Sequence, residues 1–320
     1  MTIAQMNAVV LDRFGGPEEL SLRTIPRPEV GEDDVLIRVE YSGIGSWDAT
    51  EREGDYAGAF GVPSTFPYVL GWDAAGTVAA VGRGVDRFAV GDRVYAAITP
   101  VPRGGSYAEY AVVEAEHVAH LPGRMPAAQA GALAWDALTA LSGVDLLDLQ
   151  PGATLMVFGA SGGIGHLAVQ IAKHRGLRVL AVASGDDGVA LTRRLGADAS
   201  VDGRREDVVA AASAFAPEGL DAALVTVGGA TTEQALSAVK DSGRIAWPYG
   251  VYPALSTAPR ASVSNYNGDR SSAATDRLNA IIEAGGLQVH VHRMFPLDEA
   301  RDAHLALREH YVGKLALRIA

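Results

Sequence analysis

A glycine-rich segment between an apolar run and an amphipathic helix most restricts how this chain can fold. The segment covers residues 159–165 (GASGGIG) and follows the apolar run 155–158. In this setting Gly162 lets the backbone approach a pyrophosphate, and Gly165 lets the helix pack closely on its strand. The helix N-terminus adds N–H groups and a partial positive charge. The segment therefore predicts a dinucleotide-binding turn, although Ala160 stands where the usual pattern has its first glycine.

Short apolar runs and amphipathic helices alternate through the second half of the chain. After a helical segment over 125–147, strands are expected at 155–158, 177–183, 222–227 and 244–247, with helices at 164–175 and 189–195. Such alternation is typical of a parallel, doubly wound sheet. We therefore expect an α/β fold that contains a Rossmann domain.

The first third of the chain has a different pattern of apolar residues and glycines. Residues 35–42 alternate between apolar and other side chains, and the apolar stretch 74–81 is followed by glycine corners and the turn 91–94. Closely spaced strands with glycine corners favour a curled sheet or a small barrel. From Ala261 the chain is polar to Thr275, then continues with a helix, a strand over 288–295, another helix and the run 315–319.

The end of the second strand of the dinucleotide domain bears on the choice of cofactor. An acidic residue about twenty positions after the glycines would bind the ribose hydroxyls of NAD. The strand here ends Val182-Ala183-Ser184, which leaves room for a 2′-phosphate and favours NADP(H). Ser184 can donate to that phosphate and Arg204 or Arg205 can pair with it. Asp186 and Asp187 argue for NAD instead.

Charge and composition exclude several classes of function. The 320 residues have a formal net charge of −11, so nucleic acid is not an expected general partner. The chain has no cysteine, which excludes disulfides, thiolate nucleophiles and cysteine-bound zinc. No signal peptide and no apolar run of membrane-spanning length are visible, so a cytoplasmic location is expected. The pairs His117/His120 and His290/His292 lack an evident third ligand, so no metal is expected.

Several further motifs carry a resemblance through their order and spacing, although each is weak alone. They are residues 42–48 (SGIGSWD), 70–78 (LGWDAAGTV), 90–94 (VGDRV), 105–110 (GSYAEY), 195–198 (LGAD), 227–229 (VGG) and 313–317 (GKLAL). Together with the glycine-rich segment, they make the chain resemble the medium-chain dehydrogenase/reductase superfamily over almost its whole length. Within that superfamily the chain is similar to the zinc-independent quinone oxidoreductase-like branch.

This resemblance implies a domain organisation. Residues 1–122 and 261–320 would form a GroES-like β-barrel catalytic domain, and residues 123–260 the Rossmann NADP-binding domain. The active site would lie in the cleft between the two domains, and the polar stretch 261–275 is a candidate lid. Family members commonly form homodimers, so a homodimer is expected.

The resemblance also implies that this chain lacks the catalytic zinc ligands of the superfamily's alcohol dehydrogenases. Zinc alcohol dehydrogenases of the superfamily carry a cysteine where Gly45 stands and a histidine where Trp72 stands. Without those ligands the Lewis acid of alcohol oxidation is lost, which favours reduction of an already conjugated substrate. Zinc-free members often have asparagine at Gly45, a lysine near Gly188 and a tyrosine near Gly203, and Leu133 stands where a threonine is common near the nicotinamide.

The resemblance implies an NADPH-dependent reduction of a quinone or an α,β-unsaturated carbonyl by direct hydride transfer, without metal. One alternative is an alkenal or enoyl reductase acting on a lipid-derived or natural-product enone. An alternative of another class is a non-catalytic NADPH-binding sensor, which Gly45 and Leu133 favour.

Candidate residues follow from these hypotheses. Tyr56 is the first candidate to donate to the substrate oxygen, although a loop tyrosine packed on the surface is an equal interpretation. Trp47 is expected to form an apolar wall or part of the core. Asp48 is also a candidate, although we favour a structural role for it and for Asp73. The residues expected to bind the cofactor are Ser161, Gly162, Gly163, Ile164, Gly165, Ser184, Arg204, Val227, Gly228, Tyr249 and Gly250.

Overall fold

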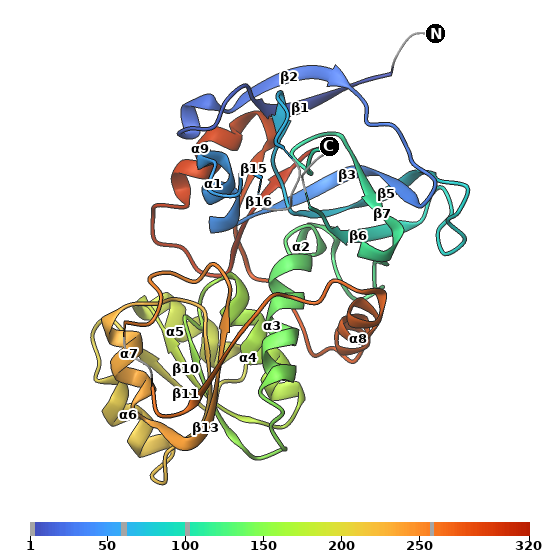
Figure 1. Cartoon of the computed structure of the whole chain (residues 1–320). Coiled ribbons are helices and arrows are strands. Elements are labelled where there is room, and N and C mark those ends of the chain that lie inside the picture. Colours follow the sequence, from blue (N-terminus) through green and yellow to red (C-terminus); the bar gives the residue numbers. More distant parts are fainter. Residues whose placement is uncertain (1–3, 59–62, 100–102, 257–258) are drawn as a thin grey trace. The chain divides into compact units, whose positions relative to one another are not determined.

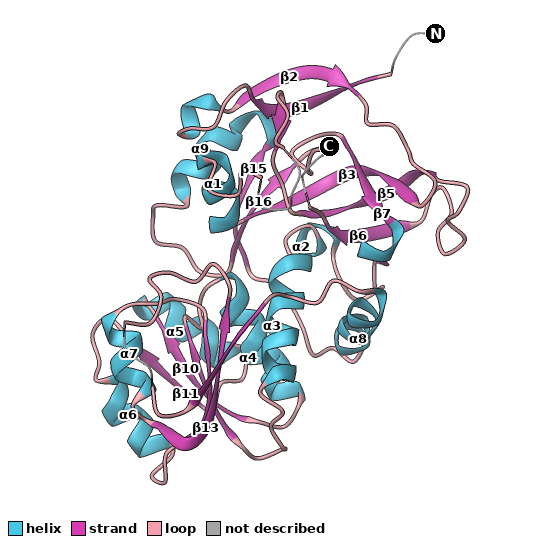
Figure 2. Ribbon diagram, viewed as in Figure 1, coloured by secondary structure: helices cyan, strands magenta, loops and turns pink. Residues whose placement is uncertain are grey.

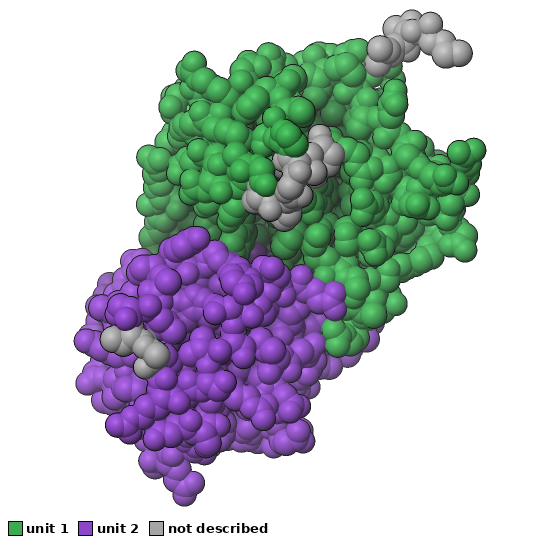
Figure 3. Space-filling view, in the orientation of Figure 1, with its two compact units in different colours: residues 1–135, 270–279, 291–320 green, residues 136–269, 280–290 purple. Residues whose placement is uncertain are grey.

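The computed structural model describes residues 4–58, 63–99, 103–256 and 259–320. The chain divides into two compact units (Figure 3). Unit 1 comprises residues 1–135, 270–279 and 291–320, and unit 2 comprises residues 136–269 and 280–290. Each unit has its own β-sheet structure and its own buried apolar residues.

Unit 2 is built on a parallel sheet, as the alternating pattern predicts. Within the described residues the sheet has six strands in the order β11-β10-β9-β12-β13-β14, and every neighbouring pair is parallel. The strands are β9 (Thr154–Phe158), β10 (Arg178–Ala183), β11 (Ala199–Asp202), β12 (Leu220–Val225), β13 (Val239–Pro248) and β14 (Ser262–Tyr266). Every residue of β9 is buried, because central strands of such sheets are covered on both faces.

Helices connect these strands (Figure 2). They are α3 (Ala134–Leu146), α4 (Gly163–His174), α5 (Gly185–Arg194), α6 (Val208–Phe215) and α7 (Ala230–Leu236). Helix α5 begins four residues before the expected start at Val189, because Asp186 and Asp187 occupy its first turn. Acidic side chains in that position are favoured by the helix dipole.

Unit 1 contains the β-structure expected from the first third of the chain. Its larger sheet has the order β15-β16-β3-β5-β6-β8, with β7 paired to β3, and a smaller sheet has the order β2-β1-β4. The strands are β1 (Gln5–Leu11), β2 (Ser21–Pro26), β3 (Asp34–Ile44), β4 (Tyr68–Val69), β5 (Asp73–Val81), β6 (Arg93–Ala97), β7 (Tyr110–Glu114), β8 (Val118–His120), β15 (Val291–Pro296) and β16 (Lys314–Arg318). The unit's helices include α1 (Ser46–Glu53), α2 (Ala127–Ala130) and α9 (Ala300–Ala306).

The C-terminal strand β16 lies inside the larger sheet of unit 1. It pairs antiparallel with β3, with Leu315 opposite Ile44, and parallel with β15 on its other side. Figure 1 shows this as a red strand beside blue β3. Strand β16 therefore belongs to the same sheet as β3, about 270 residues earlier in the sequence.

The polar stretch 261–275 is where sequence expectation and structure differ most. The dinucleotide domain was expected to end at residue 260, whereas β14 extends the parallel sheet to Tyr266 by pairing with β13. Helix α8 (Ser272–Glu283) then begins within the stretch that was a candidate lid. No helix in the described ranges is long and apolar enough to cross a bilayer.

Candidate functional site

The glycine-rich turn of unit 2 connects β9 to α4. Gly159 takes the left-handed conformation, with φ of +83°, whereas Ala160 does not have a positive φ. The backbone N–H of Ala160 donates to the Val182 carbonyl at 2.9 Å. Ala160 is tolerated in place of the usual first glycine because the turn's left-handed residue is Gly159, one position earlier.

Gly162 and Gly165 occupy different environments. A Cβ at Gly165 would lie 2.1 Å from the Gly159 carbonyl oxygen, which no side chain can tolerate. A Cβ at Gly162 would have only that same oxygen nearby, at 3.4 Å. Gly165 is therefore required by the packing of α4 on the turn, while the space beside Gly162 is open and suits a ligand.

The N-terminus of α4 suits an anion. Gly162 is its N-cap, and no side chain caps the helix. The first helical N–H groups carry the positive end of the dipole, which favours a phosphate. Ser161 joins this turn to the end of β10, because its Oγ accepts a hydrogen bond from the Ser184 N–H at 3.3 Å. The residues of this structure thus fit a bound dinucleotide.

The surroundings of Ser184 explain two departures from the family pattern. A Cβ at Gly188 would lie 2.9 Å from Ser161 Oγ, and one at Gly203 would lie 2.8 Å from Val182 Cγ1. Side chains such as the lysine and tyrosine of other members would need their neighbours to move. The nearby cation Arg204 is exposed, and its backbone N–H donates to Asp202. Its neighbour Arg205 pairs with Asp186 at 3.1 Å.

Exposed apolar side chains gather after the carboxyl ends of β12 and β13. Val227 is 43% exposed, Tyr249 58% and Tyr252 73%. The Gly228 N–H donates to the Tyr252 carbonyl at 3.3 Å, and Gly250 has φ of +85° in the turn after β13. Ligands of open α/β sheets bind at this edge, so these residues stay candidates for the nicotinamide site.

Two buried polar residues of α4 were not among the sequence candidates. The His166 ring contacts the Gly162 carbonyl through Nδ1 at 2.8 Å, and its Nε2 accepts from the His290 N–H at 3.2 Å. Gln170 bonds both backbone groups of Gln288, at 2.9 Å each. They tie the segment before β15 to the helix that follows the glycine turn. Their four-residue spacing on an otherwise apolar helix face was the signal that could have found them.

In unit 1, a single residue separates the end of β3 from the start of α1. Its N-cap is Gly45, whose N–H donates to the Asp48 carboxylate at 2.8 Å. Burial raises the pKa of Asp48 to about 7, although the Gly45 N–H and the Lys314 charge act in the opposite direction. Asp48 therefore caps a helix, as expected of a structural carboxylate. Asp73 has a similar role, since it accepts from the Trp135 N–H at 2.7 Å.

Glu51 is a second buried carboxyl group on α1, and sequence reasoning missed it. It accepts hydrogen bonds from the Tyr68 hydroxyl and from Trp72 Nε1, the latter at 2.6 Å. Burial raises the pKa of Glu51 to about 8, against the effect of the two hydrogen bonds. Tyr68 and Trp72 lie 17 and 21 residues after Glu51 in the sequence, so no local pattern predicted that the three side chains would meet.

Aromatic rings cluster around Trp72. Its ring lies edge-to-face with Trp135, with centroids 4.9 Å apart, and with Tyr56 at 6.0 Å. Tyr56 is half-buried, so its ring packs against a neighbour within unit 1. Trp47 is also half-buried, and its Cδ1 lies 3.4 Å from where a Cβ of Gly45 would be. The three candidates Tyr56, Trp47 and Asp48 therefore lie on or just after the same helix, α1.

Comparison with known proteins gives the family. The profile described as "Alcohol dehydrogenase GroES-like domain" matches residues 31–123, and "Zinc-binding dehydrogenase" matches residues 163–257. The NADPH-dependent alkenal/one oxidoreductase (chloroplastic) of Arabidopsis thaliana is 31% identical over 323 residues, which cover 98% of this chain and 79% of that protein. The chain belongs to the medium-chain dehydrogenase/reductase superfamily.

Other members of the medium-chain superfamily are similar to this chain over nearly its whole length. The quinone oxidoreductase of Sus scrofa is 28% identical over 314 residues, covering 93% of each chain, which supports the quinone oxidoreductase-like branch. A solved NAD-dependent alcohol dehydrogenase has a TM-score of 0.90 and 30% identity, covering 98% of this chain and 100% of that one. The expected α/β fold, with GroES-like and Rossmann parts, is confirmed.

Zinc, which one family description names, does not fit the residues at Gly45 and Trp72. The carboxylates nearby are already used, Asp48 by the Gly45 N–H and Glu51 by Tyr68 and Trp72. Neither Gly45 nor Trp72 offers a nitrogen or sulfur lone pair to zinc. The residues at positions 45 and 72 therefore do not fit a zinc ion.

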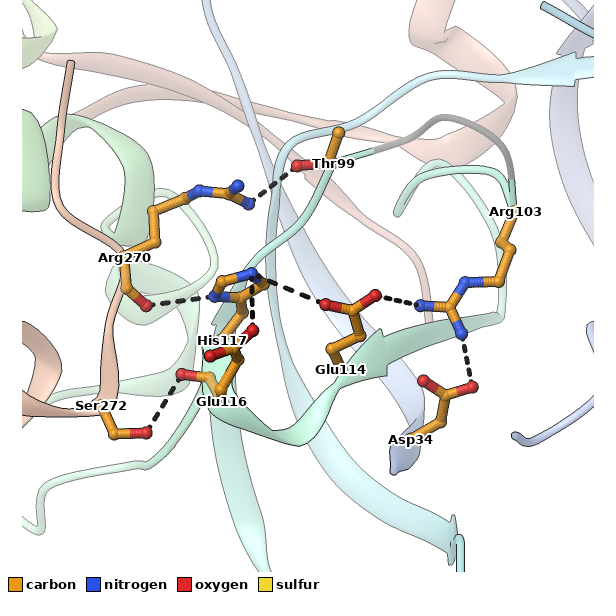
Figure 4. Close-up of polar contacts among 8 residues, drawn as sticks. All are labelled: Asp34, Thr99, Arg103, Glu114, Glu116, His117, Arg270 and Ser272. Carbon is orange, nitrogen blue, oxygen red and sulfur yellow. Dashed lines mark hydrogen bonds and ion pairs between the residues drawn. The ribbon is translucent and has the colours of Figure 1, made fainter. Parts of the chain in front are cut away.

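The described residues contain one group of three potential metal ligands, and it lies elsewhere in unit 1. His117 Nε2 is 3.9 Å from both Glu114 and Glu116 (Figure 4). His117 Nδ1 lies 3.2 Å from the Arg270 carbonyl, and Glu114 is also 3.5 Å from Arg103. The carboxylates are therefore near His117, which the sequence did not show. Of the other histidines considered in the sequence, His120 lies 3.9 Å from Asp92, and His290 precedes β15.

Proposed function

We propose that this chain transfers a hydride from NADPH to a quinone or to the β-carbon of an α,β-unsaturated carbonyl, without a metal. The observation that carries the proposal is a combination within one chain. The turn at Gly162 is open to a dinucleotide, whereas Gly45 and Trp72 replace the ligands that alcohol oxidation by zinc requires. The NADPH-dependent activity named for the Arabidopsis relative supports the same cofactor and reaction class.

The dinucleotide, when bound, supplies the hydride. On the protein side, the backbone of the turn and the start of α4 would hold the pyrophosphate, and Ser184 with Arg204 would hold the 2′-phosphate. Residues after β12 and β13 would line the nicotinamide. The proposed set is Ser161, Gly162, Gly163, Ile164, Gly165, Ser184, Arg204, Val227, Gly228, Tyr249 and Gly250.

Residues of α1 and the turn after it would act on the acceptor. The Tyr56 hydroxyl would donate a hydrogen bond to the acceptor oxygen as negative charge develops there. Trp47 would supply an apolar wall. Asp48 would act through the backbone that it caps, because its carboxyl group is buried. Catalysis would come mainly from holding the two reactants in place and from hydrogen bonds to the developing enolate.

Titration with NADPH and NADH, followed by fluorescence, tests the first half of the proposal. Addition of a quinone and of an enone to the NADPH complex tests the second half, with cofactor oxidation read at its absorbance band. Tight NADPH binding and oxidation by one acceptor would support the proposal. Absence of NADPH binding would overturn it.

Two alternatives are outcomes of the same experiment. The name of the Arabidopsis relative favours an alkenal or enone acceptor over a quinone, and the acceptor panel separates the two. A non-catalytic NADPH sensor would bind the cofactor and transfer nothing. The buried Leu133 and the side-chain-free Gly45 favour this second alternative, because neither offers a polar group.

We also propose that the protein is a cytoplasmic homodimer that takes a small-molecule substrate and no nucleic acid. The cysteine-free, acidic composition and the commonly dimeric family support this. Strand β14 stands at one edge of the sheet of unit 2, where a second copy could add a strand. Light scattering on the purified protein would give the mass, and a monomer would contradict the dimer.

A further inference from the structure

The Trp72 indole is held by contacts from several directions. Its Nε1–H donates to Glu51 Oε2 at 2.6 Å. Its ring packs edge-to-face with Trp135 and with Tyr56, at interplanar angles of 76° and 72°. Trp72 itself is only 7% exposed. The position and tilt of the ring are therefore determined by its partners.

Glu51 has no direct route to a substrate. Its side chain is 2% exposed, and its two oxygens accept from different groups, one from Trp72 and the other from the Tyr68 hydroxyl. Tyr68 is itself buried. A residue in this position can influence an acceptor only through the side chains that it holds.

Burying the carboxyl group of Glu51 costs free energy, so its presence at this position needs an explanation. A buried carboxylate loses its hydration, and an apolar side chain of similar size often stabilises a fold at least as well. A leucine at residue 51 would avoid that cost but would leave the Trp72 N–H without its acceptor. A glutamate here fixes an orientation rather than adding stability.

We propose that Glu51 is a positioning residue that holds the Trp72 ring, so that Trp72, Tyr56 and Trp135 present an aromatic wall to a planar acceptor. This inference rests on the proposed function and narrows its substrate class. Aromatic faces and edges favour flat, conjugated partners through stacking and edge contacts. Quinones and aryl enones would then be preferred to small aliphatic enones.

Three variants at α1 test this role. Glu51→Gln keeps an oxygen that accepts from Trp72 Nε1, and Glu51→Leu removes it. Glu53→Gln is the matched control, because it makes the same change on the same helix at a 49% exposed side chain that pairs with Arg52 rather than Trp72, and the amide keeps an oxygen that can accept from Arg52. Trp72→Phe removes the N–H that Glu51 holds and provides a second, independent test.

The measurements are kcat and KM for a planar naphthoquinone and for but-3-en-2-one, the NADPH Kd, and quenching of tryptophan fluorescence by acrylamide. Glu51→Leu should raise the KM for the naphthoquinone about tenfold, the size expected when a buried N–H loses its acceptor. It should also increase quenching and leave the NADPH Kd unchanged. Glu51→Gln and Glu53→Gln should stay close to the parent protein. In the Trp72→Phe background, Glu51→Leu should add no further loss.

Other results would overturn the proposal. One is equal KM values for Glu51→Leu and Glu51→Gln, and another is an equal loss for both acceptors together with weaker NADPH binding. A Glu51→Leu effect that persists unchanged in the Trp72→Phe background would also overturn it. If the parent protein binds NADPH but reduces neither acceptor, the proposed function fails. The quenching experiment would then still decide whether Glu51 holds Trp72.

Discussion

Replacing Gly165 by alanine should mainly lower the stability of the fold, whereas replacing Gly162 by alanine should mainly weaken NADPH binding. The added methyl at residue 165 would lie 2.1 Å from the Gly159 carbonyl oxygen, well inside contact distance, and a backbone oxygen cannot move aside alone. Forcing α4 away from the turn should cost about 2–3 kcal/mol. For a unit of this size, that lowers the Tm by roughly 5–10 °C.

The methyl at residue 162 would meet only one atom, at 3.4 Å, and Gly162 has an ordinary φ of −84°. We expect Gly162→Ala to change stability by less than about 1 kcal/mol, the size of an N-cap effect. The methyl would instead occupy the space proposed for the pyrophosphate. We expect the NADPH Kd to rise about tenfold to a hundredfold, or about 1.4–2.8 kcal/mol.

Thermal denaturation and fluorescence titration of the two variants give both quantities. Normal NADPH binding by a stable Gly162→Ala protein would refute the assignment of the turn to the pyrophosphate. A Gly165→Ala protein with the parent Tm would refute the packing argument. The parent protein titrated with NADPH is the reference for both.

Three further predictions concern single side chains. Burial raises the folded pKa of Asp48 from 3.8 to about 7, so stability present below pH 4 is lost as pH rises through 7. Asp48→Asn should remove this loss. The part that falls between pH 5 and pH 8 is about 3 kcal/mol, because only the two units below the folded pKa count at 1.36 kcal/mol each, and urea denaturation at pH 5 and pH 8 would show it. Parallel losses in both proteins would contradict this. Tyr95→Phe should cost about 1 kcal/mol, because the hydroxyl bonds Asn279 at 2.8 Å, and an unchanged urea midpoint would refute this. Arg204→Ala should weaken NADPH binding about tenfold and leave NADH binding unchanged, and equal titration results for the two cofactors would argue against a phosphate contact.

Local sequence patterns were sufficient for much of the fold of unit 2. Residues 155–158 of β9 and 179–183 of β10 are all apolar because both faces of a central parallel strand are covered. The glycine spacing located the turn before α4 because backbone geometry there requires it. Strand β14 was missed for the converse reason. It is an edge strand with mostly exposed or half-buried residues, so its sequence has no apolar run.

Sequence motifs likewise located some residues of the candidate sites and missed others. The motif at residues 42–48 led to α1 and to Asp48, which lies within that motif. Glu51 and Trp72 were not connected by any pattern, because their contact joins a helix to the start of a separate strand. The contacts of His166 with His290 and of Gln170 with Gln288 were similarly hidden, since these partners are more than a hundred residues away. Periodicity reports which face of an element is buried, but not which distant group lies against it.

The place of β16 has a consequence for the order in which the protein folds during synthesis. The strand lies between β15 and β3, so the sheet that β3 begins stays incomplete until residues 314–318 have left the ribosome. Unit 2 draws most of its residues from one continuous stretch, 136–269, and makes its parallel pairs within it. Contacts far apart in sequence form slowly, so we expect unit 2 to be protected first in pulsed hydrogen exchange. A newly made chain would then acquire its dinucleotide turn before the sheet that carries α1 is closed.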